Sequence, residues 1–148
     1  MNVIILGAGK VGKTLIKHMS NEDHDIIVID QDAQKIEDVV NLYDVIGVVG
    51  NGGSYDILME AGATTANLII CVTASDELNL LAGLMAKQMG TRHTIARVRN
   101  PDYSKQRDFT CKKCLNLQND VYRICNEYVL YISETPAGIR RKEIFEKP

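Results

Sequence analysis

The sequence has little of what membrane-spanning, secreted or nucleic-acid-binding proteins need. None of its apolar runs approaches the ~18 residues that a membrane span requires, and the short run at 3–6 is not preceded by the basic residues of a signal peptide. Four cysteines among 148 residues do not suggest a disulfide scaffold. A formal net charge of −2 argues against a dominant nucleic-acid-binding surface. We therefore expect a cytoplasmic globular domain of ordinary size.

Cysteine and histidine, which often carry catalysis or bind metals, are also few: the chain has four cysteines and three histidines. The C-x-x-C pair Cys111 and Cys114 has no fourth zinc ligand even if Cys125 is counted, and it lies outside a thioredoxin-like pattern. The histidines fall within the first expected helix or just before expected strands, away from the strand ends where a catalytic base would act; they are His18, His24 and His93. The sequence thus predicts neither a metal site nor a catalytic residue.

Apolar, β-branched runs alternate with helical patterns over most of the chain. Uninterrupted runs of this kind are typical of parallel strands buried on both faces, and we expect strands at 3–6, 26–29, 45–49, 68–72 and 94–98. Helices are expected at about 11–20, after the N-cap Asp32, after Ser54, from the 73–77 loop to Gly90, and from 100–102 onward. Alternating strands and helices predict an α/β fold: a Rossmann-like, doubly wound parallel sheet with helices on both faces.

Two of these helices have apolar stripes that we expect to face the sheet. In the helix after Asp32 the inner face is expected to be Ile36, Val39 and Val40. In the helix that ends at Gly90 it is expected to be Leu78, Leu81, Leu84 and Met85.

Two phosphate-binding motifs share one glycine-rich turn after the first expected strand. Gly7, Gly9 and Gly12 give the dinucleotide fingerprint G-x-G-x-x-G. Gly7 and Gly12, followed by Lys13 and Thr14, give the P-loop pattern G-x-x-x-x-G-K-T. Ligands of parallel α/β sheets bind beyond the carboxyl ends of the strands, which is where this turn lies. The two motifs imply different functions, so the rest of the chain must decide between them.

The dinucleotide motif demands an acid at the end of the second strand, and Asp30 meets that demand. Gly7 would make the tight turn, Gly9 would let the backbone approach the phosphates, and Gly12 would let the helix pack close to the strand. The phosphates would then lie at the helix N-terminus, which favours anions. A carboxylate at Asp30 accepts both ribose hydroxyls and repels a 2′-phosphate, so NADP is disfavoured.

In the P-loop interpretation Lys13 would reach the terminal phosphates, Thr14 would hold Mg²⁺ and Asp30 would serve the metal. That interpretation would start the helix at about residue 13, so Val11 would no longer belong to its apolar face. It also gives the loops at 50–54 and 73–77 no role. We favour the dinucleotide-type interpretation. A small P-loop NTPase is one alternative, and a fragment of an NAD-dependent oxidoreductase is the other. The oxidoreductase would need a substrate domain and an acid or base near the nicotinamide, for which the chain has no room.

Later segments complete a resemblance to a known family. They are Gly50-Asn-Gly52, Ala61-Gly-Ala63, Val72-Thr-Ala-Ser-Asp-Glu-Leu-Asn-Leu-Leu81 and Ala96-Arg-Val-Arg-Asn-Pro-Asp-Tyr103. With the glycine turn they resemble, over residues 1 to about 109, the N-terminal NAD-binding domain of the Trk potassium-uptake regulatory subunit (the KTN or RCK domains). The resemblance implies a cytosolic, non-enzymatic domain that binds NAD(H) or ATP/ADP and gates a membrane potassium transporter or channel. It also implies homo-oligomers, as dimers or rings, held at the inner face of the membrane by that partner.

The resemblance further implies which residues bind the nucleotide. Lys10 takes the place of the family's basic residue inside the glycine turn, and Asp30 would hold the adenosine ribose. Asn51 and Gly52 would lie beside the adenine and ribose, and Arg97 would point toward the ligand. The implied set is Gly7, Ala8, Gly9, Lys10, Val11, Gly12, Asp30, Gln31, Asn51, Gly52, Thr73, Ala74, Ser75, Glu77 and Arg97.

Structural roles are open to several of these residues as well. Asp30 could cap a helix, although Asp32 is better placed to do so. The loop at 73–77 fits a capping box for the helix that follows it. Lys10 could be a solvated surface lysine, and Arg97 in a buried strand could pair with an internal carboxylate instead of a ligand.

We divide the chain into a nucleotide-binding domain at 1–110 and an atypical C-terminal extension at 111–148. Members of the family resembled here continue after this point into a strand and a crossover helix that forms much of their dimer interface, and many carry a second, ligand-sensing lobe. The sequence of the extension does not follow that pattern.

Overall fold

Strands and helices alternate along the whole part of the chain that the computed structural model describes, residues 1–100. The elements are β1 (Asn2–Leu6), α1 (Lys10–Met19), β2 (Asp25–Asp30), α2 (Ala33–Leu42), β3 (Ile46–Val49), α3 (Tyr55–Glu60), β4 (Leu68–Cys71), α4 (Asp76–Met89) and β5 (His93–Ala96). Every strand and helix expected before residue 97 is therefore present, with ends that differ by one or two residues. The helix expected from 100–102, the division near 110 and the pair Cys111 and Cys114 lie outside the described residues.

The five strands form one parallel sheet in the order β3-β2-β1-β4-β5. The central strand β1 pairs with β2 on one side, where Val3 lies opposite Ile26, and with β4 on the other, where Val3 lies opposite Leu68. The chain thus builds outward to β3 and then crosses back to the far side of β1. A ligand crevice is expected beyond the carboxyl ends of the strands at such a reversal, here between β1 and β4. The predicted Rossmann-like sheet is confirmed.

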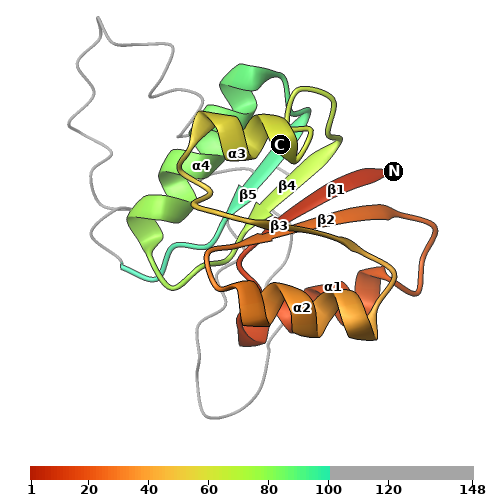
Figure 1. Cartoon of the computed structure of the whole chain (residues 1–148). Helices are drawn as coiled ribbons and strands as arrows, with labels where there is room; N and C mark the ends of the chain where they lie inside the picture. The colour runs from red at the N-terminus through yellow and green to blue at the C-terminus, as the bar shows by residue number, and fades with distance from the viewer. Residues whose placement is uncertain (101–148) are drawn as a thin grey trace, which may run out of the picture.

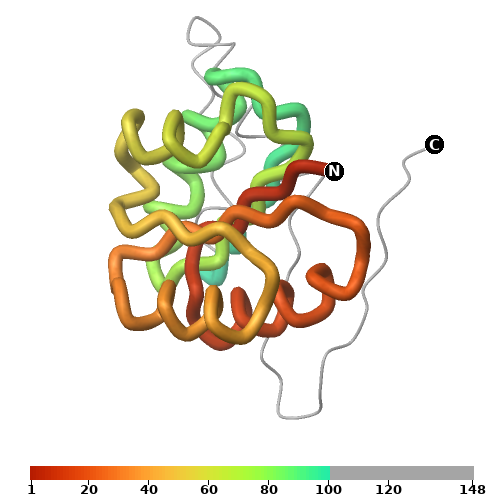
Figure 2. Tube along the Cα trace, turned by 45° about the vertical axis from the view of Figure 1, so that its right-hand side comes forward, coloured from red at the N-terminus to blue at the C-terminus, as the bar shows by residue number. Residues whose placement is uncertain are grey.

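Each face of the sheet is covered by two helices, so the sheet has a separate apolar core on either side. α1 and α2 lie together below it, and α3 and α4 lie above it (Figures 1 and 2). Alternate residues of β1 serve the two cores: Ile4 and Leu6 pack with the α3 and α4 side, Val3 and Ile5 with the α1 and α2 side. Burial on both faces explains why β1 is an unbroken apolar run.

The inner face of α4 differs from the predicted one. Leu81 is 48% exposed, whereas the residues buried on this helix are polar or small: Asp76, Asn79, Ala82, Gly83 and Ala86. Small side chains let α4 approach the sheet closely, and a Cβ added at Gly83 would lie 3.8 Å from the Cβ of Ala96 in β5. The prediction that Leu81 faces the sheet is therefore wrong, because it followed the largest apolar side chains.

The inner face predicted for α2 is wrong at one position. Ile36 and Val39 are buried, but Val40 is 42% exposed. α2 lies beside the edge strand β3, where a Cβ at Gly47 would meet both Ile36 and Val40. Within residues 1–100 β3 is the last strand on this side of the sheet, so α2 lies at the sheet's edge, where Val40 stays partly exposed. The expected N-cap of α2 is confirmed: the Asp32 carboxylate accepts hydrogen bonds from the N–H groups of Gln34 and Lys35. None of the helices within residues 1–100 is long and apolar enough to cross a bilayer.

Candidate functional site

A cleft of about 440 Å³ lies at the carboxyl ends of β1, β2 and β4. Ligand-binding pockets commonly measure roughly 300–1,000 Å³. The cleft is lined by Leu6, Gly7, Gly9, Asp30, Gln31, Asp32, Lys35, Gly50, Gly52, Val72, Thr73, Ala74, Ser75 and Leu78. It therefore has a polar wall from the β2–α2 connection, a floor from the glycine turn, and a second wall from the β4–α4 connection.

The three glycines of the turn meet different demands. Gly7 has φ of +109° and donates its N–H to the carbonyl of Ile29 in β2 at 2.8 Å. A Cβ at Gly12 would overlap the carbonyl oxygen of Gly7, so the helix and the turn touch backbone to backbone. Gly9, the N-cap of α1, has φ of −75°, and a Cβ there would meet nothing within 4 Å. Protein packing accounts for Gly7 and Gly12, but it leaves the space beside Gly9 open.

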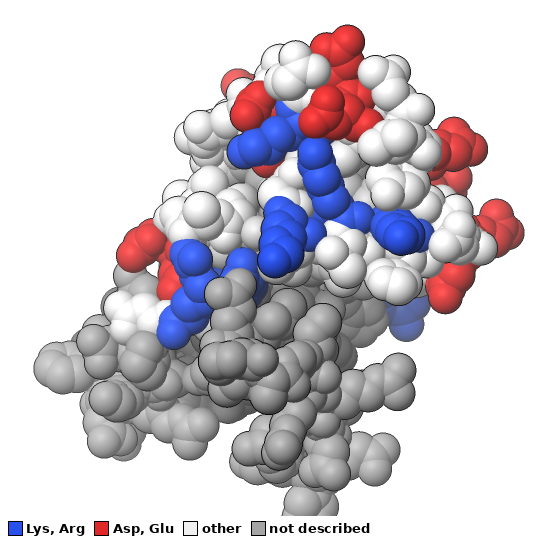
Figure 3. All heavy atoms as spheres, turned by 90° about the horizontal axis from the view of Figure 1, so that it is seen from below, with Lys and Arg blue, Asp and Glu red and all other residues white. Residues whose placement is uncertain are grey.

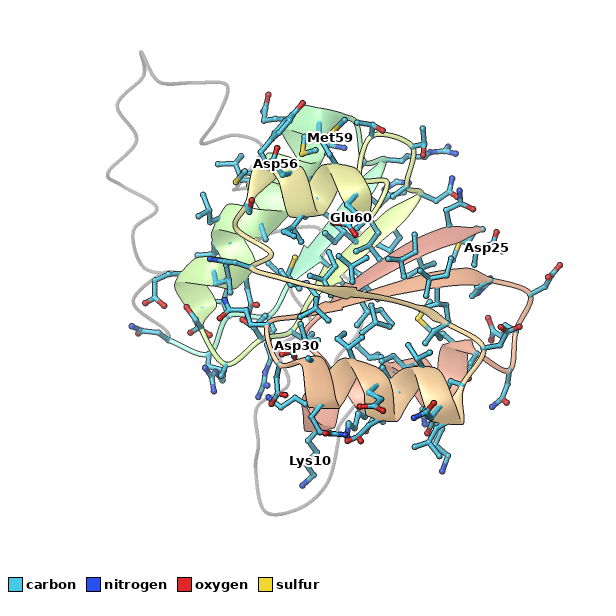
Figure 4. The ribbon with its side chains drawn as sticks, viewed as in Figure 1. Lys10, Asp25, Asp30, Asp56, Met59 and Glu60 are labelled. Atoms are coloured by element: carbon cyan, nitrogen blue, oxygen red, sulfur yellow. The ribbon has the colours of Figure 1, made fainter. Side chains whose placement is uncertain are left out.

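Asp30 is fixed at the rim of the cleft by two backbone N–H groups. Its Oδ2 accepts a hydrogen bond from Ala8 at 2.7 Å, and its Oδ1 accepts one from Asp32 at 2.9 Å. The carboxylate thereby ties the glycine turn to the end of β2. Figure 4 shows Asp30 on the side of the sheet where α1 and α2 lie. A carboxylate oxygen can accept more than one hydrogen bond. Asp30 can therefore hold this position and still accept from a ribose.

The two residues that would distinguish a P-loop, Lys13 and Thr14, do not line the cleft. The ammonium of Lys13 lies 3.2 Å from the carboxylate of Asp38 on α2, and the hydroxyl of Thr14 donates to the carbonyl of Lys10 at 2.9 Å. α1 begins at Lys10, so Val11 is part of the helix. Its side chain packs against the core between the sheet and the helices α1 and α2. Lys13 and Thr14 thus act within and between helices instead of at a phosphate.

Lys10 also lies outside the cleft. Its exposed side chain projects from the start of α1 away from the sheet and from Asp30 (Figure 4). α1 carries Lys10, Lys13 and Lys17 and no acidic residue in its first turn. Lysine and arginine side chains gather on the face of the molecule seen from below, where α1 and α2 lie (Figure 3). In this conformation Lys10 contributes to that face.

The remaining implied residues divide between the cleft and its supports. Those that line it are Gly7, Gly9, Asp30, Gln31, Gly52, Thr73, Ala74 and Ser75. Those that do not are Ala8, Lys10, Val11, Gly12, Asn51, Glu77 and Arg97. Lining residues outside the predicted set are Leu6, Asp32, Lys35, Gly50, Val72 and Leu78. Among these, Lys35 could have been found from its place in the first turn of the helix that Asp32 caps.

Capping and cleft formation coincide at the start of α4. Ser75 lines the cleft, and its Oγ also accepts a hydrogen bond from the N–H of Leu78 at 3.1 Å. The same hydroxyl donates to Glu77 at 2.9 Å. Ser75 therefore caps α4, as expected for a residue of this loop, and it lines the cleft as well.

Asp76, next to this wall, anchors the chain that leaves β5. It is buried and accepts hydrogen bonds from the N–H groups of Arg99 and Asn100, each at 2.8 Å, and from Arg99 Nε at 3.3 Å. Arg99 also contacts the carbonyl of Ala74. Burial alone would raise the pKa of Asp76, but the N–H groups of Asn100 and Arg99 and the Arg99 guanidinium outweigh it, so the pKa is lowered.

Asp76→Asn is expected to weaken the acid sensitivity of the fold. Because the pKa of Asp76 is lower in the folded state, its ionised form contributes stability that is fully present above the unfolded pKa, near 3.8, and is lost as the pH falls through the folded value. Asp76→Asn should therefore be less stable than wild type at pH 7 and approach it below about pH 4. Urea unfolding at a series of pH values measures this. Asp56→Asn, at an exposed acid of α3, is the control; equal wild-type and Asp76→Asn slopes below pH 4 would contradict the expectation.

Comparisons with known proteins agree with this geometry. A family model described as the TrkA-N domain matches residues 3–109. The Trk system potassium uptake protein TrkA homolog of Archaeoglobus fulgidus is 41% identical over 103 residues, which are 70% of this chain and 23% of that protein. The chain thus spans about a quarter of the length of this curated relative.

Solved structures of low sequence identity have the same fold. The TrkA-N domain of the inner membrane protein ybaL from Escherichia coli superposes with a TM-score of 0.64 at 20% identity, over 68% of this chain and 75% of that one. The GsuK channel bound to NAD superposes with a TM-score of 0.62 at 20% identity, over 70% of this chain and 19% of that one. Likeness at this level of identity establishes the architecture alone, because one fold can carry many functions.

Proposed function

The chain belongs to the TrkA-N domain family, and from this premise we propose that its first domain is a nucleotide-binding regulatory module that gates a membrane potassium transporter or channel. The A. fulgidus relative is named for potassium uptake, and a channel that contains a domain of this fold has been solved with NAD. In this proposal the module works at the cytoplasmic face of the membrane, as a homo-oligomer bound to the transport protein. Nucleotide occupancy favours one of two states of the assembly and so biases the transporter.

One observation carries the nucleotide part of the proposal: Gly9, beside which there is an unfilled space, lines the same cleft as a carboxylate held in place at Asp30. Packing does not require a glycine at position 9, whose φ suits any residue. A ligand backbone that passes close to the turn does require one. Anions are favoured at this point because the first N–H groups of a helix have no partner within it.

The residues present fit NAD(H). Asp30 would accept the two hydroxyls of the adenosine ribose, and the glycine turn at the N-terminus of α1 would hold the phosphates. The wall at 72–75 would face the rest of the ligand. ATP and ADP present the same adenosine ribose and remain second candidates. NADP is disfavoured because its 2′-phosphate would approach the Asp30 carboxylate.

We further propose that the module senses its nucleotide without transforming it. The described residues that line the cleft include no histidine, tyrosine or cysteine. Its ionisable side chains, Asp30, Asp32 and Lys35, all belong to the wall expected to hold the adenosine. An oxidoreductase would need a proton donor or acceptor on the other wall, near the nicotinamide.

Calorimetric titration with NADH, NAD⁺, NADPH, ATP and ADP, with and without Mg²⁺, tests the proposal. Wild type should bind NADH and should bind NADPH much more weakly, and Lys13→Ala should bind NADH as wild type does. Magnesium-dependent ATP hydrolysis that disappears in Lys13→Ala would instead establish the P-loop alternative. Co-purification of the full chain with a membrane potassium transporter tests the partner, and its repeated failure would count against that part of the proposal.

A further inference from the structure

Asn79, on the second turn of α4, is a fully buried amide that uses its whole hydrogen-bonding capacity. Its Oδ1 accepts from the N–H of Thr73 at 2.9 Å and from the Thr73 hydroxyl at 2.7 Å. Its Nδ2 donates to the carbonyl of Thr73 at 3.3 Å and to the carbonyl of Arg97 at 2.9 Å. Two acceptor positions and two donor positions are all that an amide side chain has. A buried network this complete fixes its partners in one arrangement.

The residue fixed most firmly by Asn79 is Thr73, which lines the cleft. Its N–H, carbonyl and hydroxyl all bond to the one amide. The Thr73 hydroxyl also accepts a hydrogen bond from the N–H of Ser75 at 3.2 Å. By holding Thr73, Asn79 therefore also helps to position Ser75 at the end of the wall. Asn79 itself does not line the cleft, and its influence on a ligand passes through Thr73 and Ser75.

The fourth hydrogen bond of Asn79 anchors this wall to the sheet. Arg97, whose carbonyl accepts it, donates its own N–H to the carbonyl of Cys71 in β4 at 2.8 Å. Asn79 therefore joins the β4–α4 connection to the chain just after β5, which is itself bonded to the end of β4. A loop held in this way keeps its shape before a ligand arrives, which lowers the cost of binding.

We propose that Asn79 is a positioning residue for the part of a bound nucleotide that lies beyond the adenosine monophosphate. This rests on the proposed function, in which Asp30 holds the ribose and the glycine turn holds the first phosphate. Asp30 ends β2 and the wall at 73–75 follows β4, on opposite sides of β1 and its glycine turn, so in this proposal the wall meets the second half of a dinucleotide. Asn79 thus sets affinity for NADH and leaves AMP nearly unaffected.

Calorimetric titration of Asn79→Ala with NADH and with AMP tests this proposal. We expect NADH affinity to fall by about tenfold or more and AMP affinity to change by less than about twofold. Thr91→Val is the matched control, because Thr91 is buried after the other end of α4 and its hydroxyl donates to the carbonyl of Ala63 at 2.6 Å. That variant removes a buried hydrogen bond at a distance from the cleft, so it should lower the melting temperature and leave both affinities unchanged.

Amide hydrogen exchange of wild type supplies a readout that does not depend on the variant's folding. The N–H of Thr73 is bonded to the Asn79 side chain; NADH should slow its exchange, and AMP should not. Equal losses of NADH and AMP affinity in Asn79→Ala, or no loss, would overturn the proposal, as would Thr73 exchange that NADH leaves unchanged. If wild type binds neither nucleotide, the proposed function fails and this inference fails with it.

Discussion

Gly12→Ala is expected to destabilise the domain severely. The new Cβ would overlap the carbonyl oxygen of Gly7 and would also lie too close to the carbonyl carbon of Gly7. Both groups are backbone, and Gly7 is held by β2 through its N–H, so no side chain can turn aside to make room. Overpacked cores lose about 1–3 kcal/mol even where side chains can shift. We expect a loss of about 4 kcal/mol or more, which is a large part of the 5–15 kcal/mol that stabilises an ordinary domain.

Gly9→Ala, three residues after the end of β1 in the same turn, is the matched control. A Cβ at position 9 meets nothing within 4 Å, and φ of −75° is ordinary for alanine. Its free energy of unfolding should stay within about 1 kcal/mol of wild type. Urea unfolding followed by circular dichroism measures both variants. Similar unfolding curves for Gly12→Ala and Gly9→Ala would show that the close approach of α1 to the turn is not needed for folding.

Asp30→Ala is expected to reduce nucleotide affinity by about a hundredfold or more. Hydrogen bonds to a charged group contribute about 1.5–3 kcal/mol each, and a ribose offers two hydroxyls to this carboxylate. The substitution also frees the N–H groups of Ala8 and Asp32, which loosens the turn that would hold the phosphates. Titration with NADH at a temperature where the variant remains folded measures the loss.

The control for Asp30→Ala is Asp38→Ala. Asp38 is an acid of α2 that pairs with Lys13 and does not line the cleft, so its removal makes the same change of net charge without touching the site. Asp38→Ala should bind NADH as wild type does. Asp30→Ala should also reduce the preference for NADH over NADPH, since the repulsion of the 2′-phosphate is removed. If Asp30→Ala kept NADH affinity within about threefold, the ribose role of Asp30 would be wrong.

The fold could be predicted well because the strands of a parallel sheet carry a strong local signal. Residues 3–6 must be apolar at every position, since β1 is buried on both faces. The inner face of α4 could not be predicted in the same way. There the requirement for close approach selected Ala82, Gly83 and Ala86, and Leu81 was left half exposed. Helical spacing alone does not tell which of two apolar stripes the sheet will accept.

In the candidate site, too, some residues could be predicted from local sequence and others depend on contacts between distant segments. Asp30 and the glycine turn follow from sequence because each occupies a fixed place after a recognisable strand. Asn79 could not be predicted, since one asparagine in a helix has nothing local to distinguish it, and its bond to the Arg97 carbonyl joins residues 18 apart. Lys10 was placed by its position in the motif, but the direction of its side chain depends on where α1 begins.

The central position of β1 has a consequence for how the protein is made. Of the five strands β1 is translated first, yet one of its two neighbours, β4, follows only after three further helices and two strands. The side chain of Asn67, just before β4, accepts a hydrogen bond from the N–H of Asn2, a partner 65 residues earlier in the chain. Until β4 emerges, one edge of the nascent sheet's most apolar strand stays unpaired, and the wall at 72–75 does not exist. A nucleotide bound to the folded domain would stabilise the completed sheet by mass action, and the part of the cleft that follows β4 can form only once β4 has paired with β1.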